Sequence, residues 1–174
     1  MLLISDMILD YQPYNTGNEL EGGAISSNES FISWENSHIR TWLNNTFKSC
    51  AFSDAETNII IETLLTTEND ILPTCITRDK VFILSANEFY EYTKNATVGT
   101  MNQIATDIAK KQRAQEDCWN ACYTRNQKPN SGLFGLSDVY SPGVIEKGTA
   151  YYLSASHEIG AIRPCIWIDI SKVD

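Results

Sequence analysis

The spacing of apolar residues predicts an amphipathic helix within the stretch 34–56. Four apolar side chains recur at the three- and four-residue intervals of one helical face: Ile39, Trp42, Leu43 and Phe47. The polar residues between them fall mostly on the opposite side, so the apolar face is expected to join the core. Ser53 and Glu56 match a capping box, in which a hydroxyl and a carboxylate each bind a backbone amide at a helix start. A second helix is therefore expected to begin there.

Shorter apolar runs, separated by turn-forming residues, predict β-strands in the rest of the chain. Strand or hairpin segments are expected at 2–5 and 7–9, 59–67, 81–84, 119–125, 144–152 and 161–170. The segment 144–152 is expected to be a hairpin that turns at Lys147 and Gly148. Two loops are expected, at 14–30, which is rich in Gly, Asn and Ser, and at 68–78, which contains Pro73.

Two further helices and one core are expected from the same pattern. Ser85 and Glu88 repeat the capping box ahead of a short helix, and residues 103–115 have a helical composition. Seven large apolar side chains are expected to be largely buried in one contiguous core: Trp42, Leu43, Phe47, Phe52, Phe82, Leu84 and Trp167.

Several motifs in combination resemble those of one known family. They are L-L-I-S at 2–5, Q-P-Y-N at 12–15, the stretch 34–56, D-K-V-F-I-L-S at 79–85 and I-R-P-C-I-W-I at 162–168. Together they resemble a family of bacterial domains of unknown function, number 6273, over nearly the whole chain. The resemblance implies a C-type-lectin-like fold, similar to that of formylglycine-generating enzymes and of variable ligand-binding proteins that retroelements diversify. Related chains usually carry one or two further strands before L-L-I-S, whereas this chain opens directly on it.

The expected fold is a single α+β domain spanning 1–174. Following the resemblance, it is C-type-lectin-like, with helices packed on a twisted antiparallel sheet whose first and last strands lie near each other. A chain of 174 residues is long enough to bury roughly 70% of its unfolded surface without disulfides. Its five cysteines have irregular spacing and are expected to be free thiols: Cys50, Cys75, Cys118, Cys122 and Cys165.

The charge of the chain excludes several classes of partner. The formal net charge is −9 at pH 7, so nucleic acid and anionic membranes would be repelled. The densest cationic run, at 110–113, has three charges beside Glu116 and Asp117, which is typical of a solvated helix face. The chain has neither a membrane-spanning apolar run nor a signal-peptide pattern, so a cytoplasmic or surface-displayed domain without membrane insertion is expected.

The segment from Trp119 to Tyr140 is the candidate binding region. It places aromatic side chains among Asn, Ser and Gly residues, the types that serve as adaptable contacts. Aromatic faces and a guanidinium fork suit sugars or peptide carboxylates through stacking and paired hydrogen bonds. The candidate ligand-binding residues are Trp119, Tyr123, Arg125, Phe134, Tyr140 and Arg163. A carbohydrate, peptide or protein ligand is expected, with no metal and no cofactor.

Some of these residues also have a structural interpretation. Trp119 is expected to pack between sheet and helices, with Arg125 paired to a carboxylate, because buried tryptophan usually belongs to the core. Arg163 precedes Pro164 inside an apolar segment, where a charge is costly without a partner. We therefore also consider that Arg163 is an anchor for a carboxylate or for backbone carbonyls; strand alternation alone would equally place it in solvent.

An oxidase is the second interpretation. Formylglycine-generating enzymes also place two closely spaced cysteines near the C-terminus, and their thiolates hold copper. Here three residues, rather than four, separate Cys118 from Cys122. On a regular strand the two residues would lie about 13 Å apart, too far to share a metal.

The favoured function is a non-catalytic ligand- or protein-binding module of a bacterial protein. A purely structural or interaction domain of a larger surface protein is the third interpretation. The calcium-and-sugar triplets of many C-type lectins are absent from the sequence, which disfavours calcium-dependent sugar binding. Fold resemblance alone is a weak basis for assigning activity.

Overall fold

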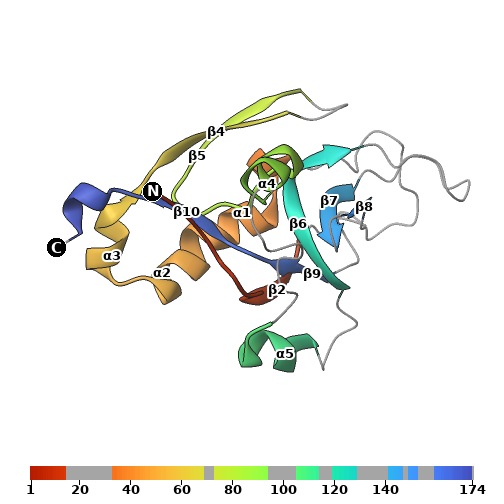
Figure 1. The fold of residues 1–174 in the computed structure, drawn as a ribbon, viewed down its shortest axis with the longest axis horizontal. Coiled ribbons are helices and arrows are strands. Elements are labelled where there is room, and N and C mark those ends of the chain that lie inside the picture. The colour runs from red at the N-terminus through yellow and green to blue at the C-terminus, as the bar shows by residue number, and fades with distance from the viewer. Residues whose placement is uncertain are drawn as a thin grey trace, which may run out of the picture.

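Helices and three sheets make up the part of the chain that the computed structural model describes, namely residues 1–14, 33–68, 73–93, 105–113, 119–128, 141–146, 149–152 and 159–173 (Figure 1). The strands are β1 (Leu2–Ile4), β2 (Asp10–Pro13), β3 (Ile60–Ile61), β4 (Thr63–Thr67), β5 (Cys75–Asp79), β6 (Trp119–Lys128), β7 (Ser141–Glu146), β8 (Thr149–Tyr152), β9 (Ile159–Ile162) and β10 (Cys165–Ile168). The helices are η2 (Trp34–Asn36), α1 (His38–Trp42), the π-helical η3 (Leu43–Phe47), α2 (Lys48–Ala51), α3 (Asp54–Ile59), α4 (Ala86–Thr93), α5 (Asp107–Arg113) and η4 (Ile170–Lys172).

The predicted amphipathic helix is the consecutive run of α1, η3 and α2. The hydroxyl of Ser37 accepts from the Arg40 amide and caps its start. Ile39 and Leu43 are fully buried, which confirms the predicted apolar face. The capping box of Ser53 and Glu56 is also confirmed, and it opens α3 after a short break.

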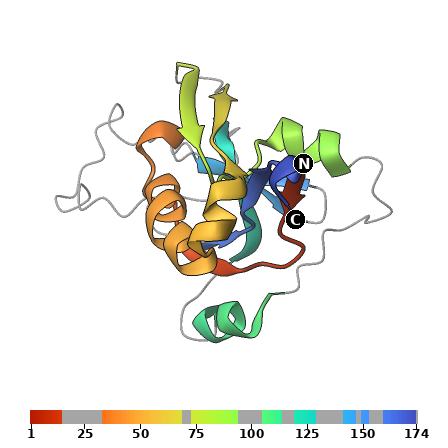
Figure 2. The same cartoon turned by 90° about the vertical axis from the view of Figure 1, so that its left-hand side faces the viewer.

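The first and last strands are neighbours, as expected. β10 lies between β1 and β3 and is antiparallel to both, with Leu2 opposite Trp167 and Ile61 opposite the same residue. The marked chain ends accordingly lie close together (Figure 2). The five-stranded sheet has the order β2-β9-β6-β7-β8, and its β6–β9 pair is parallel. The sheet is therefore mixed, and the expectation of an antiparallel sheet was wrong for this pair.

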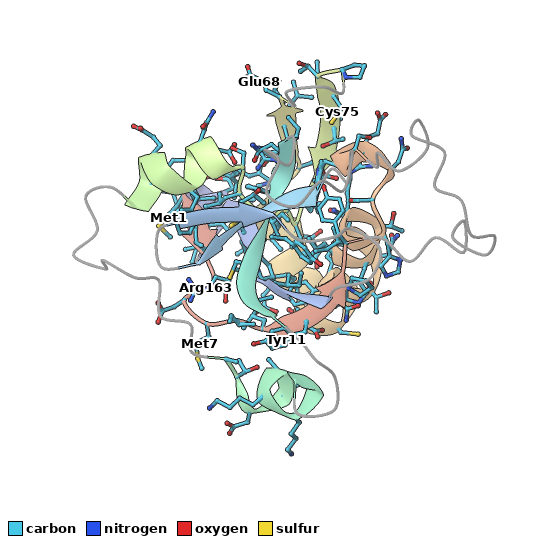
Figure 3. All side chains as sticks on the ribbon, turned by 90° about the vertical axis from the view of Figure 1, so that its right-hand side faces the viewer. Met1, Met7, Tyr11, Glu68, Cys75 and Arg163 are labelled. Carbon is cyan, nitrogen blue, oxygen red and sulfur yellow. The ribbon has the colours of Figure 1, made fainter. Side chains whose placement is uncertain are left out.

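Strand β5 occupies the last part of the loop expected at 68–78 and forms a hairpin with β4. Residues of β5 alternate between buried and exposed, so one face of the hairpin packs on the core and the other meets solvent. The pairing runs from Thr63 opposite Asp79 to Thr67 opposite Cys75. Figure 3 shows Glu68 and Cys75 at the outer end of this hairpin.

The expected closing strand at 161–170 is two strands, because Arg163 and Pro164 interrupt it. Proline has no amide hydrogen to donate to a ladder. The Pro164 carbonyl still accepts a hydrogen bond from the Ser5 amide. Residues 81–84 were also expected to be a strand. They are buried but extend no ladder, and Phe82 alone pairs with Cys165 through two backbone hydrogen bonds.

The seven predicted core residues belong to one contiguous cluster, as expected. Leu43, Phe82 and Leu84 are buried, while the other four are only partly buried and pack against the same cluster: Trp42, Phe47, Phe52 and Trp167. The sequence did not predict the two largest fully buried aromatic side chains in the described residues, Trp34 and Tyr14.

A second, smaller cluster joins the helix α5 to the sheet. Ala105 and Ala109 pack there with Ile8, Tyr11 and Ala161, which confirms a helix within 103–115. Within the described ranges, no helix is both long and apolar enough to span a membrane.

Candidate functional site

Strand β6 carries three of the predicted site residues, Trp119, Tyr123 and Arg125, and lies in the middle of the five-stranded sheet. Its pairing with β7 shifts register between Tyr123 and Gln127. The side chains of residues 123–126 are all buried, which departs from the alternation of a regular strand. At this bulge the Arg125 amide donates to the Leu84 carbonyl, 3.1 Å away. The bulge therefore directs Arg125 into the interior.

The Arg125 side chain is fully enclosed and its guanidinium fork is occupied. Its two terminal nitrogens donate to the carboxylate of Glu88 at 2.6 and 2.8 Å. Further donations reach the Ile83 carbonyl at 2.8 Å and the Thr67 hydroxyl at 3.4 Å. The structural interpretation of Arg125, pairing with a carboxylate, is thus confirmed.

Glu88 links this ion pair to the start of helix α4. Its carboxylate accepts from the Ser85 amide at 2.8 Å while it also binds Arg125. Partial burial acts to raise the pKa of Glu88, but hydrogen bonds and charge from Arg125, with the Ser85 cap, outweigh it and hold the pKa below its usual range. The carboxylate is therefore ionised at neutral pH and balances the buried guanidinium.

Tyr123 is buried between two neighbours. Its ring meets that of Tyr14 edge to face, with centroids 5.5 Å apart. On another side it lies directly on Gly160 of β9, where an added Cβ would come within 2.4 Å of the ring. The absence of a side chain at residue 160 is what allows the ring to lie there.

We expect Gly160→Ala to lower the free energy of unfolding by about 1 to 3 kcal/mol, because the new methyl group must displace a ring already packed against Tyr14. Chemical denaturation measures this change. The double variant Gly160→Ala with Tyr123→Leu should lose less than the two single changes added together, because the smaller side chain removes the clash. Strict additivity would show that the ring does not lie on Gly160.

Arg163 lies in the interior beside β6 (Figure 3) and is only 6% exposed. One of its terminal nitrogens donates to the backbone carbonyl of Asp6, so the predicted pairing of Arg163 with a backbone carbonyl is confirmed. Arg163 also lines a cavity of about 20 Å³ with Leu84, Phe89 and Thr124. That volume holds about one water molecule and is too small for a sugar or a peptide side chain.

Two thiols line the same cavity, those of Cys122 and Cys165. Burial raises the pKa of Cys122 to about 11 and that of Cys165 to about 12, so both are protonated at neutral pH. Cys118, the other candidate copper ligand, lies outside the described residues. Within the part of the chain that the structure describes, no three His, Cys, Asp or Glu side chains are grouped so as to hold a metal ion.

A second buried polar cluster surrounds Asp79, which the sequence did not predict. Its carboxylate accepts from the indole nitrogen of Trp34 at 3.0 Å, the hydroxyl of Thr77 at 2.7 Å and the guanidinium of Arg40 at 2.8 Å. Asn44 completes the cluster and binds the backbone of residues 80 and 81. Arg40 and Asn44 are four residues apart and so lie on one side of the helix. That spacing was the feature of the sequence that could have indicated the cluster.

The remaining candidates are only partly within the described residues. Trp119 opens β6 and pairs with Gly160 through the backbone, and its side chain is outside the described set. Phe134 and Tyr140 lie outside the described residues. Tyr123, Arg125 and Arg163 are thus brought together around the interior of β6, where they hold elements in place rather than form an open surface.

Comparison with known proteins identifies a family for this chain. The chain matches no curated protein and no solved structure. A family model described as Domain of unknown function (DUF6273) matches residues 1–170. Because this match covers nearly all of the chain, the protein belongs to the DUF6273 family.

Proposed function

We propose that this chain is a non-catalytic ligand- or protein-binding module of a bacterial protein, with ligand contacts concentrated between Trp119 and Tyr140. The observation that carries the proposal is that the connection 129–140 begins and ends at a paired position of the five-stranded sheet. The two residues that flank this connection, Lys128 and Ser141, are directly paired across β6 and β7. Binding residues commonly occupy connections that a rigid scaffold positions.

Buried hydrogen bonds and an ion pair connect β6, the strand that leads into 129–140, to neighbouring elements. Arg125 ties β6 to α4 through Glu88 and to the segment before α4 through the Ile83 carbonyl. The hydroxyl of Tyr14 donates to the Arg125 carbonyl at 3.2 Å, which adds the end of β2 to the same support. In this proposal the buried residues Tyr123, Arg125 and Arg163 have a structural role. Phe134, Tyr140 and their neighbours in the sequence contact the ligand.

The composition of 129–140 supports a ligand surface with little charge, on which aromatic and small polar residues are mixed. Its sequence, P-N-S-G-L-F-G-L-S-D-V-Y, combines two aromatic residues with Asn, Ser and Gly and has a single charge, at Asp138. Aromatic and amide groups recognise carbohydrates and peptides by stacking and hydrogen bonding. A carbohydrate or peptide ligand bound without a metal is the form of the proposal.

A C-type-lectin-like fold is part of the same proposal. Two features support it: consecutive helices follow the first strands, and the closing strand β10 returns between β1 and β3. The oxidase interpretation is less well supported, because the cavity that Cys122 lines measures about 20 Å³, which holds about one water molecule and leaves no room for a substrate.

Replacing 129–140 with Asn-Gly tests the proposal. A two-residue Asn-Gly turn can close the β6–β7 hairpin between Lys128 and Ser141. We expect the variant to retain the parent's cooperative melt and to lose every ligand that the parent binds on glycan and peptide arrays. A chelator should not change binding by the parent.

The matched control is Ile76→Thr, which changes an exposed side chain on the outer face of the β4–β5 hairpin. It should bind as the parent does. Binding that survives removal of 129–140 would place the site elsewhere, and binding lost in chelator would favour a metal-dependent site.

A further inference from the structure

The register shift in β6 is a bulge of two residues. Tyr123 faces Val144, and four residues later Gln127 faces Pro142, only two residues from Val144 along β7. Three residues of β6, 124–126, therefore lie opposite the single residue Gly143. Pro142 and Gly143 are residue types that occur where a ladder is interrupted. The bulge bends β6 just before it reaches the connection 129–140.

A regular register is available to the same two strands. If β7 moved by two residues, Tyr123 would face Glu146 and the pairing of Gln127 with Pro142 could continue without a bulge. Side chains alternate between faces with a period of two, so this movement would leave every β7 residue on its original face. β8 pairs with β7 in a hairpin and could move with it. The hydrophobic pattern of β7 therefore does not select between the two registers.

The contacts of Arg125 do distinguish them. Within the bulge the Arg125 amide bonds to Leu84 rather than to β7, and its side chain reaches Glu88, Ile83 and Thr67. The ring of Phe82 lies 5.6 Å from the guanidinium carbon. These contacts tie the extra residues of β6 to α4 and to the segment before it.

We propose that Glu88 is a positioning residue, which holds the two-residue bulge through Arg125 and so sets the register in which β7 pairs with β6. Two charge-assisted hydrogen bonds fix the guanidinium in one orientation, and that orientation requires Arg125 to stay in the bulge. The bend of β6 just before the connection 129–140, and with it the direction in which that connection leaves the sheet, follows from this register. That consequence for ligand binding rests on the proposed function, whereas the register does not.

Nuclear magnetic resonance of Glu88→Gln tests the assignment. Glutamine keeps the size and one acceptor oxygen of Glu88 but removes the charge. We expect the contact between the backbones of Tyr123 and Val144 to weaken at least twofold and a contact between Tyr123 and Glu146 to appear. Amide resonances of residues 127–128 and 141–146 should shift or double.

The matched control is Asp79→Asn, which neutralises another buried carboxylate bound to an arginine, whose partners Arg40 and Trp34 belong to α1 and η2 rather than to β6 or β7. It should destabilise the fold and leave the Tyr123–Val144 contact intact. If Glu88→Gln does not fold, Thr67→Val removes a weaker contact of Arg125 and should give the same change at smaller amplitude.

Two outcomes overturn the assignment. One is a folded Glu88→Gln, or in its place Thr67→Val, with the parent's strand contacts; the other is an equal change in Asp79→Asn. The array experiment fails separately, since binding that survives replacement of 129–140 refutes the proposed function and leaves the register result standing. Unchanged strand contacts refute the positioning role even where 129–140 binds a ligand.

Discussion

Trp34→Ala is expected to lower the free energy of unfolding by about 3 to 5 kcal/mol, the range for removing a large buried aromatic side chain. Trp34 is 0% exposed and belongs to the main core cluster. Its indole nitrogen also donates to Asp79, so the change removes one of the donors that satisfy a buried carboxylate. Chemical denaturation followed by circular dichroism measures the loss.

Trp42→Ala is the control for that experiment. It removes the same side chain from a position that is only partly buried at the edge of the same cluster, against Phe47. The loss at Trp42 should be smaller than at Trp34, because less of its surface leaves water on folding. An equal or larger loss at Trp42 would contradict the burial of Trp34.

The second large effect is expected at Glu88. At pH 7, Glu88→Gln should cost about 3 kcal/mol, because it leaves the guanidinium of Arg125 buried without its counter-charge. This is the lower end of the usual range, since 30% of the Glu88 side chain is exposed and water can solvate the altered group. Thermal or chemical unfolding of both proteins gives the difference.

The same pair predicts a dependence on pH. The pKa of Glu88 is lower in the folded state than its ordinary value, so the unfolded state binds the proton more readily. The stability that the carboxylate contributes is therefore fully present above its unfolded pKa and is lost as pH falls through its folded pKa. The gap between parent and Glu88→Gln should close in acid; a gap that stays constant down to strong acid would show that the ion pair is not its source.

Local patterns predicted the helices and their caps well. The apolar face of α1 and the two capping boxes depend on residues three or four positions apart, so the sequence contains the whole interaction. The β7–β8 hairpin was also predicted, because a turn joins strands that follow each other directly. The prediction that seven large apolar residues share one core was also correct. Large apolar side chains are usually buried, and a single domain offers them one core.

Interactions between distant residues were harder to predict. Trp34 precedes the helical pattern and is buried because Asp79, far along the chain, offers its indole an acceptor. Cys75–Asp79 alternates like a strand, but its short length and nearby Pro73 favoured a loop. The bulge at Arg125 depends on Glu88 and Leu84, and neither the spacing nor the composition of β6 indicates that partnership. The support for the candidate site was therefore the least predictable part.

The position of β9 and β10 also determines when the chain can fold during synthesis. β10 lies between β1 and β3 in the three-stranded sheet, and β9 lies between β2 and β6 in the five-stranded sheet. Neither sheet can be completed until these late strands are available. A ribosome makes them after almost everything they pair with, and contacts that close such long loops form slowly. The early strands therefore remain without these pairing partners, and the apolar face of α1 remains partly exposed, until β9 and β10 have been synthesised. A shortened chain that lacks β9 and β10 should emerge as a substrate for chaperones and proteases rather than as a smaller domain.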